Sequence, residues 1–194
     1  MKNSNGFTLV ELLITLIIVS VLLAVGLPSL KTFLQGNQLV AATNELLSAV
    51  HIARSEAIKL NTNVTLCESS NGTTCAATGD WENGWIVFVD SNADRAGTGA
   101  ACAAIGTDCL LRVHAAFTDN QLTLTGQNAG GASVSSYTFN SRGLPRGVGG
   151  TSQSGSFSVC SLDEAGNTIG SRAVVVGLSG RVRVSDNAAV ISCP

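Results

Sequence analysis

An apolar segment of 21 residues, from Phe7 to Leu27, opens the chain after a short polar start. Its one charged residue is Glu11. A helix of this length, at about 1.5 Å per residue, reaches across the ~30 Å hydrocarbon core of a membrane. A carboxylate in such a segment is costly unless it has a partner or a function. The pattern therefore predicts a hydrophobic transmembrane or subunit-packing helix over residues 7–34, in which Glu11 has a specific role.

Beyond Gly36 the apolar residues recur at steps of three and four, which is the period of one helix face. These positions are Leu39, Ala42, Leu46, Val50, Ala53 and Ala57. Residues 35–60 are therefore expected to form an amphipathic helix half that packs on a folded domain. Pro28 is expected to kink the helix without ending it. Turn-forming residues from Asn61 onward are expected to end it.

Residues 61–194 are a succession of short β-like runs separated by Gly, Ser and Asn. Eight runs are expected to be strands, at residues 64–67, 84–89, 110–113, 122–124, 137–139, 156–160, 172–176 and 180–184. Charged residues make up only 12% of the chain and 21 residues are glycine, which is typical of short strands and turns. The pattern predicts an α+β fold, in which the long helix packs on antiparallel sheets in a β-sandwich-like globular domain.

Six cysteines lie outside the apolar segment, at Cys67, Cys75, Cys102, Cys109, Cys160 and Cys193. An even number in an exported domain indicates disulfides rather than metal ligands. The spacing favours the pairs Cys67–Cys75, Cys102–Cys109 and Cys160–Cys193, although six cysteines allow other pairings. Asp90–Asp94 has the spacing of a calcium loop, but Arg95 and Ala101 stand where that loop needs glycine and glutamate. We therefore expect an oxidising compartment and no metal site.

The start of the chain, Gly6-Phe7-Thr8-Leu9-Val10-Glu11-Leu12, resembles the class III signal of type IV pilins and type II secretion pseudopilins. The resemblance implies that a prepilin peptidase removes residues 1–6 by cutting between Gly6 and Phe7, and methylates the new N-terminus. It also implies that Glu11 pairs with the methylated amine of a neighbouring subunit. The expected location is the inner membrane, with the globular domain in the periplasm, followed by incorporation into a surface pilus beside other pilin and minor pilin subunits. A plain membrane anchor with an incidental glutamate is the alternative.

Later stretches resemble the FimT and GspH branch of minor pilins and pseudopilins. They are residues 53–59, 84–90, 139–143 and 180–183, so the similarity extends from Gly6 to Arg183. This resemblance implies the type IV pilin-like fold, which agrees with the predicted helix and strands.

Positive charge gathers toward the carboxyl end although the net charge is −2. Residues 110–194 contain six arginines against four acidic residues, and arginine suits bidentate contacts with phosphate. In an extended strand Arg181 and Arg183 would project from one face about 6.5–7 Å apart, close to the spacing of successive phosphates. An exposed strand whose polar face happens to carry arginine is the alternative.

Gly180-Arg181-Val182-Arg183 also resembles the Gly-Arg-x-Arg motif with which FimT-type minor pilins of naturally transformable bacteria bind DNA. The resemblance implies capture of extracellular DNA, independent of its sequence, for uptake in natural transformation. Arg142 and Arg146, in a turn-rich loop, are expected to support these contacts, with Arg172 as a further candidate. A plain hairpin connection is an equal alternative for that loop.

Motifs for catalysis do not occur in the sequence, and His51 and His114 are isolated, so we do not expect an enzyme or a cofactor. The alternative to DNA capture is a structural role. In that case the chain is a FimT-like or GspH-like subunit that primes assembly of a pilus or a type II secretion pseudopilus and binds no DNA.

Overall fold

The computed structural model describes residues 7–97, 100, 102, 107–118, 121–147 and 150–193, except for the side chains of residues 25 and 27–29. Helix α1 (Leu9–Leu60) runs through Pro28, as predicted. Thr8 caps its start, because the backbone N–H of Glu11 donates to Thr8 Oγ1 at 3.2 Å. Asn61 ends it in the left-handed conformation, with φ of 52°.

The chain divides into two compact units, residues 1–38 and 39–194. In the first unit, the large apolar side chains from Leu9 to Leu23 are all about half exposed or more. Within the part of the chain that the structure describes, no helix is both long and apolar enough to cross a membrane.

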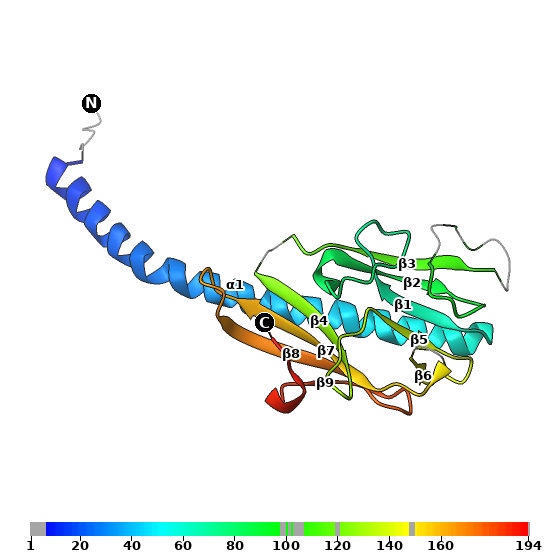
Figure 1. The fold of residues 1–194 in the computed structure, drawn as a ribbon. Helices are drawn as coiled ribbons and strands as arrows, with labels where there is room; N and C mark the ends of the chain where they lie inside the picture. The colour runs from blue at the N-terminus through cyan, green and yellow to red at the C-terminus, as the bar shows by residue number, and fades with distance from the viewer. Residues whose placement is uncertain are drawn as a thin grey trace. The chain divides into compact units, whose positions relative to one another are not determined.

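The second unit contains two antiparallel sheets (Figure 1). The first sheet has the order β3-β2-β1-β5-β6. Its strands are β1 (Val64–Glu68), β2 (Gly84–Val89), β3 (Cys109–Ala115), β5 (Ser136–Phe139) and β6 (Pro145–Arg146). The second sheet has the order β4-β7-β8-β9. Its strands are β4 (Leu122–Asn128), β7 (Gly155–Leu162), β8 (Thr168–Val176) and β9 (Val182–Ser185). Short 3-10 turns lie at Trp81–Asn83 and Ala188–Val190. This arrangement confirms the predicted α+β fold.

One hydrophobic core joins the second half of α1 to both sheets. The helix contributes the predicted periodic positions, Leu39, Ala42, Leu46, Val50, Ala53 and Ala57, all of which are buried. Alternation along β1 sends Val64 and Leu66 into this core. Tyr137 of β5 links the sheets, because its buried hydroxyl donates to the backbone oxygen of Gln127 at 2.8 Å; burial raises the pKa of this phenol.

All eight predicted strands are present, but the last one begins later than predicted. Gly180 and Arg181 belong to the turn between β8 and β9 and not to β9 itself. The reason is the backbone at Gly180, which has φ of 74° and donates from its N–H to Gly177 O at 2.8 Å. A positive φ is incompatible with an extended strand and is accessible to glycine. The short strand β6 was not predicted.

The structure contains the three disulfides that the spacing favoured. They join Cys67 to Cys75, Cys102 to Cys109, and Cys160 to Cys193. The third bond fastens the carboxyl-terminal segment to β7.

Candidate functional site

Two distant turns meet at Gly143 and Gly180. Gly143 lies in the turn between β5 and β6, and Gly180 lies in the turn between β8 and β9. Both have positive φ, and a Cβ added to Gly180 would overlap the backbone oxygen of Gly143. Only glycine permits so close an approach of two backbones. The contact brings a turn of one sheet against a turn of the other.

Two arginines flank this contact in sequence, and a third reaches it from α1. Arg142 precedes Gly143, and Arg181 follows Gly180. A third arginine, Arg54 of α1, donates from Nε to Gly143 O at 3.2 Å. We call Arg54, Arg142, Gly143, Gly180 and Arg181 the arginine junction. The sequence singled out both turns, but it did not indicate Arg54, which reaches them only through the folding of the helix onto the sheets.

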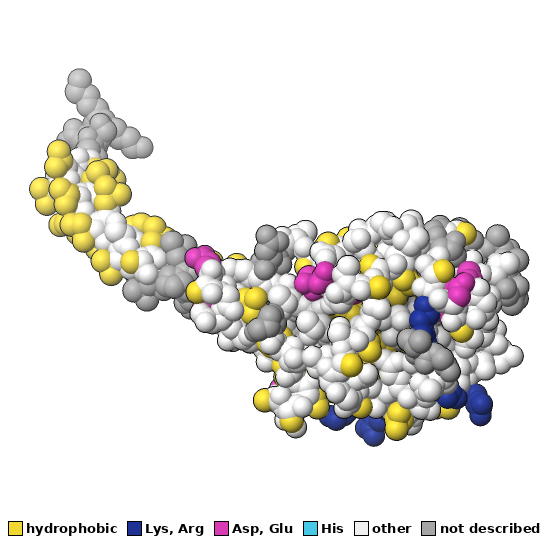
Figure 2. Space-filling model, viewed as in Figure 1, with side chains coloured by type: hydrophobic (Ala, Val, Ile, Leu, Met, Phe, Trp, Pro, Cys, Tyr) yellow, Lys and Arg dark blue, Asp and Glu magenta, His cyan; other side chains and the backbone are white. Residues whose placement is uncertain are grey.

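Arg142, Arg181 and Arg183 are all exposed. Within the described residues, no side-chain hydrogen bond or ion pair engages their guanidinium groups. Although Arg181 precedes β9, its carbonyl accepts from Gly177 N at 2.9 Å, so the alternation of the strand extends to it. Lys and Arg side chains gather along the lower edge of the folded unit in Figure 2, where Figure 1 shows β9 and the turn before it. The side chains of Arg181 and Arg183 are therefore both exposed, although only Arg183 lies in β9.

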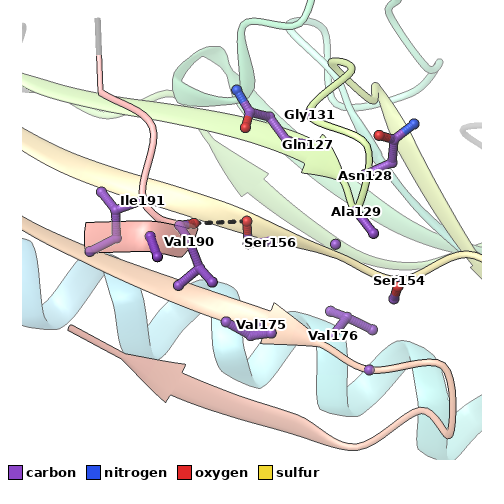
Figure 3. Close-up of a pocket in the computed structure, with 13 residues that line it drawn as sticks. Gln127, Asn128, Ala129, Gly131, Ser154, Ser156, Val175, Val176, Val190 and Ile191 are labelled. Atoms are coloured by element: carbon purple, nitrogen blue, oxygen red, sulfur yellow. Dashed lines mark hydrogen bonds between the residues drawn. The ribbon is translucent and has the colours of Figure 1, made fainter. Parts of the chain in front are cut away.

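Arg183 lies beside the face of the second sheet that points away from the core. It pairs in register with Val175 of β8, which lines a pocket of about 370 Å³. Figure 3 shows this pocket between β7, β8 and the carboxyl-terminal segment. Ser156 Oγ donates to Val190 O at 3.0 Å and holds that segment in place. Arg183 thus projects next to a surface of mixed polar and apolar groups.

Arg146 differs from Arg142 in having hydrogen-bond partners within the protein. It pairs with Thr138 on the first sheet, and its Nη1 donates to Gly150 O at 3.2 Å and to Ser152 Oγ at 3.3 Å. Arg95 lines the same pocket as Arg146 and donates from Nη2 to the backbone oxygen of Gly147. The donors of Arg146 are therefore partly used within the protein.

Arg172 is also separated from Arg183. It pairs in register with the buried Val159, so alternation places it on the core-facing side of the sheet, whereas Arg183 pairs with Val175 on the other side. Its Nε lies 3.7 Å from Asp186 Oδ1. Arg172 therefore lies on the opposite face of the sheet from Arg183 and does not form one basic patch with it.

The structure brings three carboxylates together near the predicted turn after β2. Oxygen atoms of Asp90, Asp94 and Asp108 lie within 4.8 Å of one another; the sequence analysis had not included Asp108. We call these residues the acidic cluster. Protein groups already donate to each: Thr65 Oγ1 to Asp90 at 2.6 Å, Ala96 N to Asp94 at 2.8 Å, and Ser91 N to Asp108 at 2.9 Å. Burial raises the pKa of Asp90.

The predicted processing and assembly residues at the amino-terminal end are Gly6, Phe7 and Glu11. Gly6 lies outside the described residues. Phe7 is exposed, and Glu11 is exposed in the first turn of α1. Cleavage after Gly6 and pairing of Glu11 with another subunit stay predictions.

His114 has a partner that the sequence did not reveal. Its Nε2 lies 2.8 Å from Glu45 Oε2 on α1, and its ring stacks on Trp85 with centroids 3.8 Å apart. These contacts join the helix to the first sheet.

Comparison with known proteins places these features in a class. The described fold is similar to the crystal structure of the type IV minor pilin FimU from Pseudomonas aeruginosa strain PAO1. The TM-score is 0.51 and the sequence identity 24%, over 79% of this chain and 92% of FimU. A second crystal form of FimU gives a TM-score of 0.47 at 23% identity, over 75% of this chain and 90% of that one. The fold is thus that of a type IV pilin.

Two family models match the chain. The model described as "Type II transport protein GspH" matches residues 42–180, and that of the prokaryotic N-terminal methylation motif matches residues 1–27. A search of curated proteins found no match. Because the first model covers more than half of the sequence, the chain belongs to the GspH family. It is a minor pilin or pseudopilin, and its methylation motif implies interaction with other pilins and with a prepilin peptidase.

Proposed function

We propose that this chain is a minor type IV pilin that binds extracellular DNA, independent of sequence, for uptake in natural transformation. The observation that carries the proposal is the contact between Gly143 and Gly180, because the neighbouring residues Arg142 and Arg181 are exposed, as is Arg183. Their guanidinium groups have no protein partner within the described residues, so their donors are available to phosphate. Contacts of this kind position a protein on DNA without reading its bases.

The amino-terminal motif suggests how the protein would be processed and assembled. After cleavage between Gly6 and Phe7, α1 holds the subunit in the inner membrane with residues 39–194 in the periplasm, and Glu11 guides its incorporation into the pilus. The disulfides suit the oxidising compartment in which that domain would fold. No catalytic step is part of the proposal.

Binding of a fluorescent DNA duplex to the full chain in a non-ionic detergent tests the proposal. We expect the Arg181→Gln/Arg183→Gln double variant to bind roughly 10- to 100-fold more weakly, because two charged contacts are lost. The matched control is Arg112→Gln/Arg172→Gln, which removes the same charge from β3 and from the ion pair with Asp186. Equal binding by the parent chain and the first variant would exclude Arg181 and Arg183 from the interface.

The match to the GspH family model favours a second candidate function. In that case the chain primes assembly of a pilus or a type II secretion pseudopilus and binds no DNA. A strain that lacks the gene discriminates the two functions: the first predicts normal pili with lost transformation, and the second predicts lost assembly.

A further inference from the structure

Arg54 has unused hydrogen-bonding capacity at the arginine junction. Its Nε donates to Gly143 O at 3.2 Å and lies 2.9 Å from where a Cβ of Gly180 would be. Within the described residues, its two terminal amino groups, Nη1 and Nη2, have no acceptor. An arginine that is fixed through Nε presents these two groups as a preorganised fork.

Among the residues that the structure describes, no carboxylate forms an ion pair with Arg54. The side chain is half-buried, and the nearby acidic residue on α1, Glu56, pairs with Lys59 at 3.1 Å. Asp186, which follows β9, lies 3.7 Å from Arg172. A partly desolvated guanidinium against two turns that each carry a further arginine favours binding of an anion.

The three cations come from three different elements that the fold fixes against one another. Arg54 comes from α1, Arg142 from the turn after β5, and Arg181 from the turn before β9. The close contact of Gly143 with Gly180 holds the backbones of the two turns together, and the hydrogen bond from Arg54 to Gly143 ties them to the helix. The backbones that carry Arg142 and Arg181, and the Nε of Arg54, are therefore held in place before any ligand arrives, which lowers the entropic cost of binding.

We propose that Arg54, Arg142 and Arg181 form a binding site for one phosphate group. This inference rests on the proposed function in taking that phosphate to be one of a DNA backbone. Arg54 then has two roles: Nε positions the turns, and the terminal amino groups contact the phosphate. Arg183 contacts a neighbouring phosphate of the same strand.

The first test uses inorganic pyrophosphate and amide NMR of the full chain in detergent micelles. The expected result is saturable shifts of the Gly143 and Gly180 amide signals, which are lost in Arg54→Gln and kept in the matched control Arg112→Gln, an exposed arginine of β3. Absence of saturable shifts in the parent chain overturns the proposal even if a variant fails to fold. Equal loss in both variants also overturns it, because a general charge effect would then suffice.

The second test uses DNA binding at one salt concentration. We expect Arg54→Gln to weaken binding roughly tenfold, because a charged contact to the phosphate is lost. We expect Arg54→Lys to restore most of this binding, because it keeps the charge, but not the melting temperature, because it lacks the Nε bond. A lowered melting temperature with unchanged DNA binding in Arg54→Gln would reduce Arg54 to a structural residue.

The two proposals fail in distinguishable ways. Pyrophosphate shifts at the junction without DNA binding would contradict the proposed function and keep the phosphate site. DNA binding of equal affinity in the parent chain and Arg54→Gln, with no shifts at the junction, would contradict the phosphate site and keep the proposed function.

Discussion

The arginine junction and the acidic cluster both gather like charges, but they differ in what the fold does with them. Each carboxylate of the acidic cluster accepts hydrogen bonds from nearby protein groups, such as Ser91 and Thr65. The exposed arginines have no such partners within the described residues. Like charges that are satisfied internally are part of the architecture, whereas fixed charges with unused donors are candidates for binding.

The largest expected effect is on the backbone contact that builds the arginine junction. Gly180→Ala should lower the free energy of unfolding by roughly 2–4 kcal/mol, since it adds both a strained φ and an overlap with Gly143 O. Gly166→Ala is the control, because φ there is 84° but no atom lies within 4 Å of its Cβ. Gly166→Ala should lower the free energy of unfolding by only about 1 kcal/mol. Denaturant unfolding measures this free energy for both variants. Similar losses in the two would show that the overlap at Gly180 is relieved without a cost in stability.

The next effect separates Arg142 from Arg146. Arg142→Gln should weaken DNA binding by about fivefold to tenfold, because an available charged donor is lost. Arg146→Gln should change it less than about threefold, because Nη1 of Arg146 already donates to Gly150 and Ser152. Binding isotherms of the two variants at one salt concentration decide the point. The reverse ranking would move the interface to the edge of the first sheet.

A smaller effect is expected in the acidic cluster as pH changes. The pKa of Asp90 is raised by burial, so the folded state holds this proton longer than the unfolded state does. Asp90 therefore makes stability fall as pH rises from the ordinary aspartate pKa near 3.8 to the raised value. The free energy of unfolding, measured across this pH range, should no longer fall in the Asp90→Asn variant.

Asp163 provides a control of opposite sign. Its pKa is lowered by hydrogen bonds from Asn167, so its contribution is present above the ordinary pKa and is lost as pH falls through the lowered value. Asp163→Asn should remove a rise in stability with pH. If both variants shift the profile in the same direction, the assignment for Asp90 is wrong.

The smallest expected effect is that of calcium. Because protein donors satisfy the acidic cluster, millimolar calcium should leave the melting temperature of the full chain unchanged. A rise that disappears in Asp108→Asn would instead identify the cluster as a cation site.

Local patterns predicted much of the fold. The three-and-four spacing of Leu39 to Ala57 identified the buried face of α1, and short alternating runs identified eight strands. The boundary at Gly180 was wrong because a run of β-favouring residues does not reveal a positive φ, which depends on the approach of Gly143 from another sheet.

The site was predictable only in part, for a similar reason. The motif residues Arg181 and Arg183 and the loop residue Arg142 stand out in the sequence. Their convergence, the inclusion of Arg54, and the separation of Arg172 come from contacts between residues far apart in the chain. Asp108 joins Asp90 and Asp94 through the same kind of contact.

The most direct test of the central claim is the salt dependence of DNA binding by the full chain. The two proposed phosphate contacts, one at the arginine junction and one at Arg183, predict a slope of log K against log salt near −1.8, and so a loss of roughly 12-fold between 50 and 200 mM salt. In the Arg181→Gln/Arg183→Gln variant the slope should become shallower by about 0.9, because the contact of Arg183 is lost while Arg54 and Arg142 still face the other phosphate. A slope near zero in the parent chain, or the same slope in both proteins, would contradict the account.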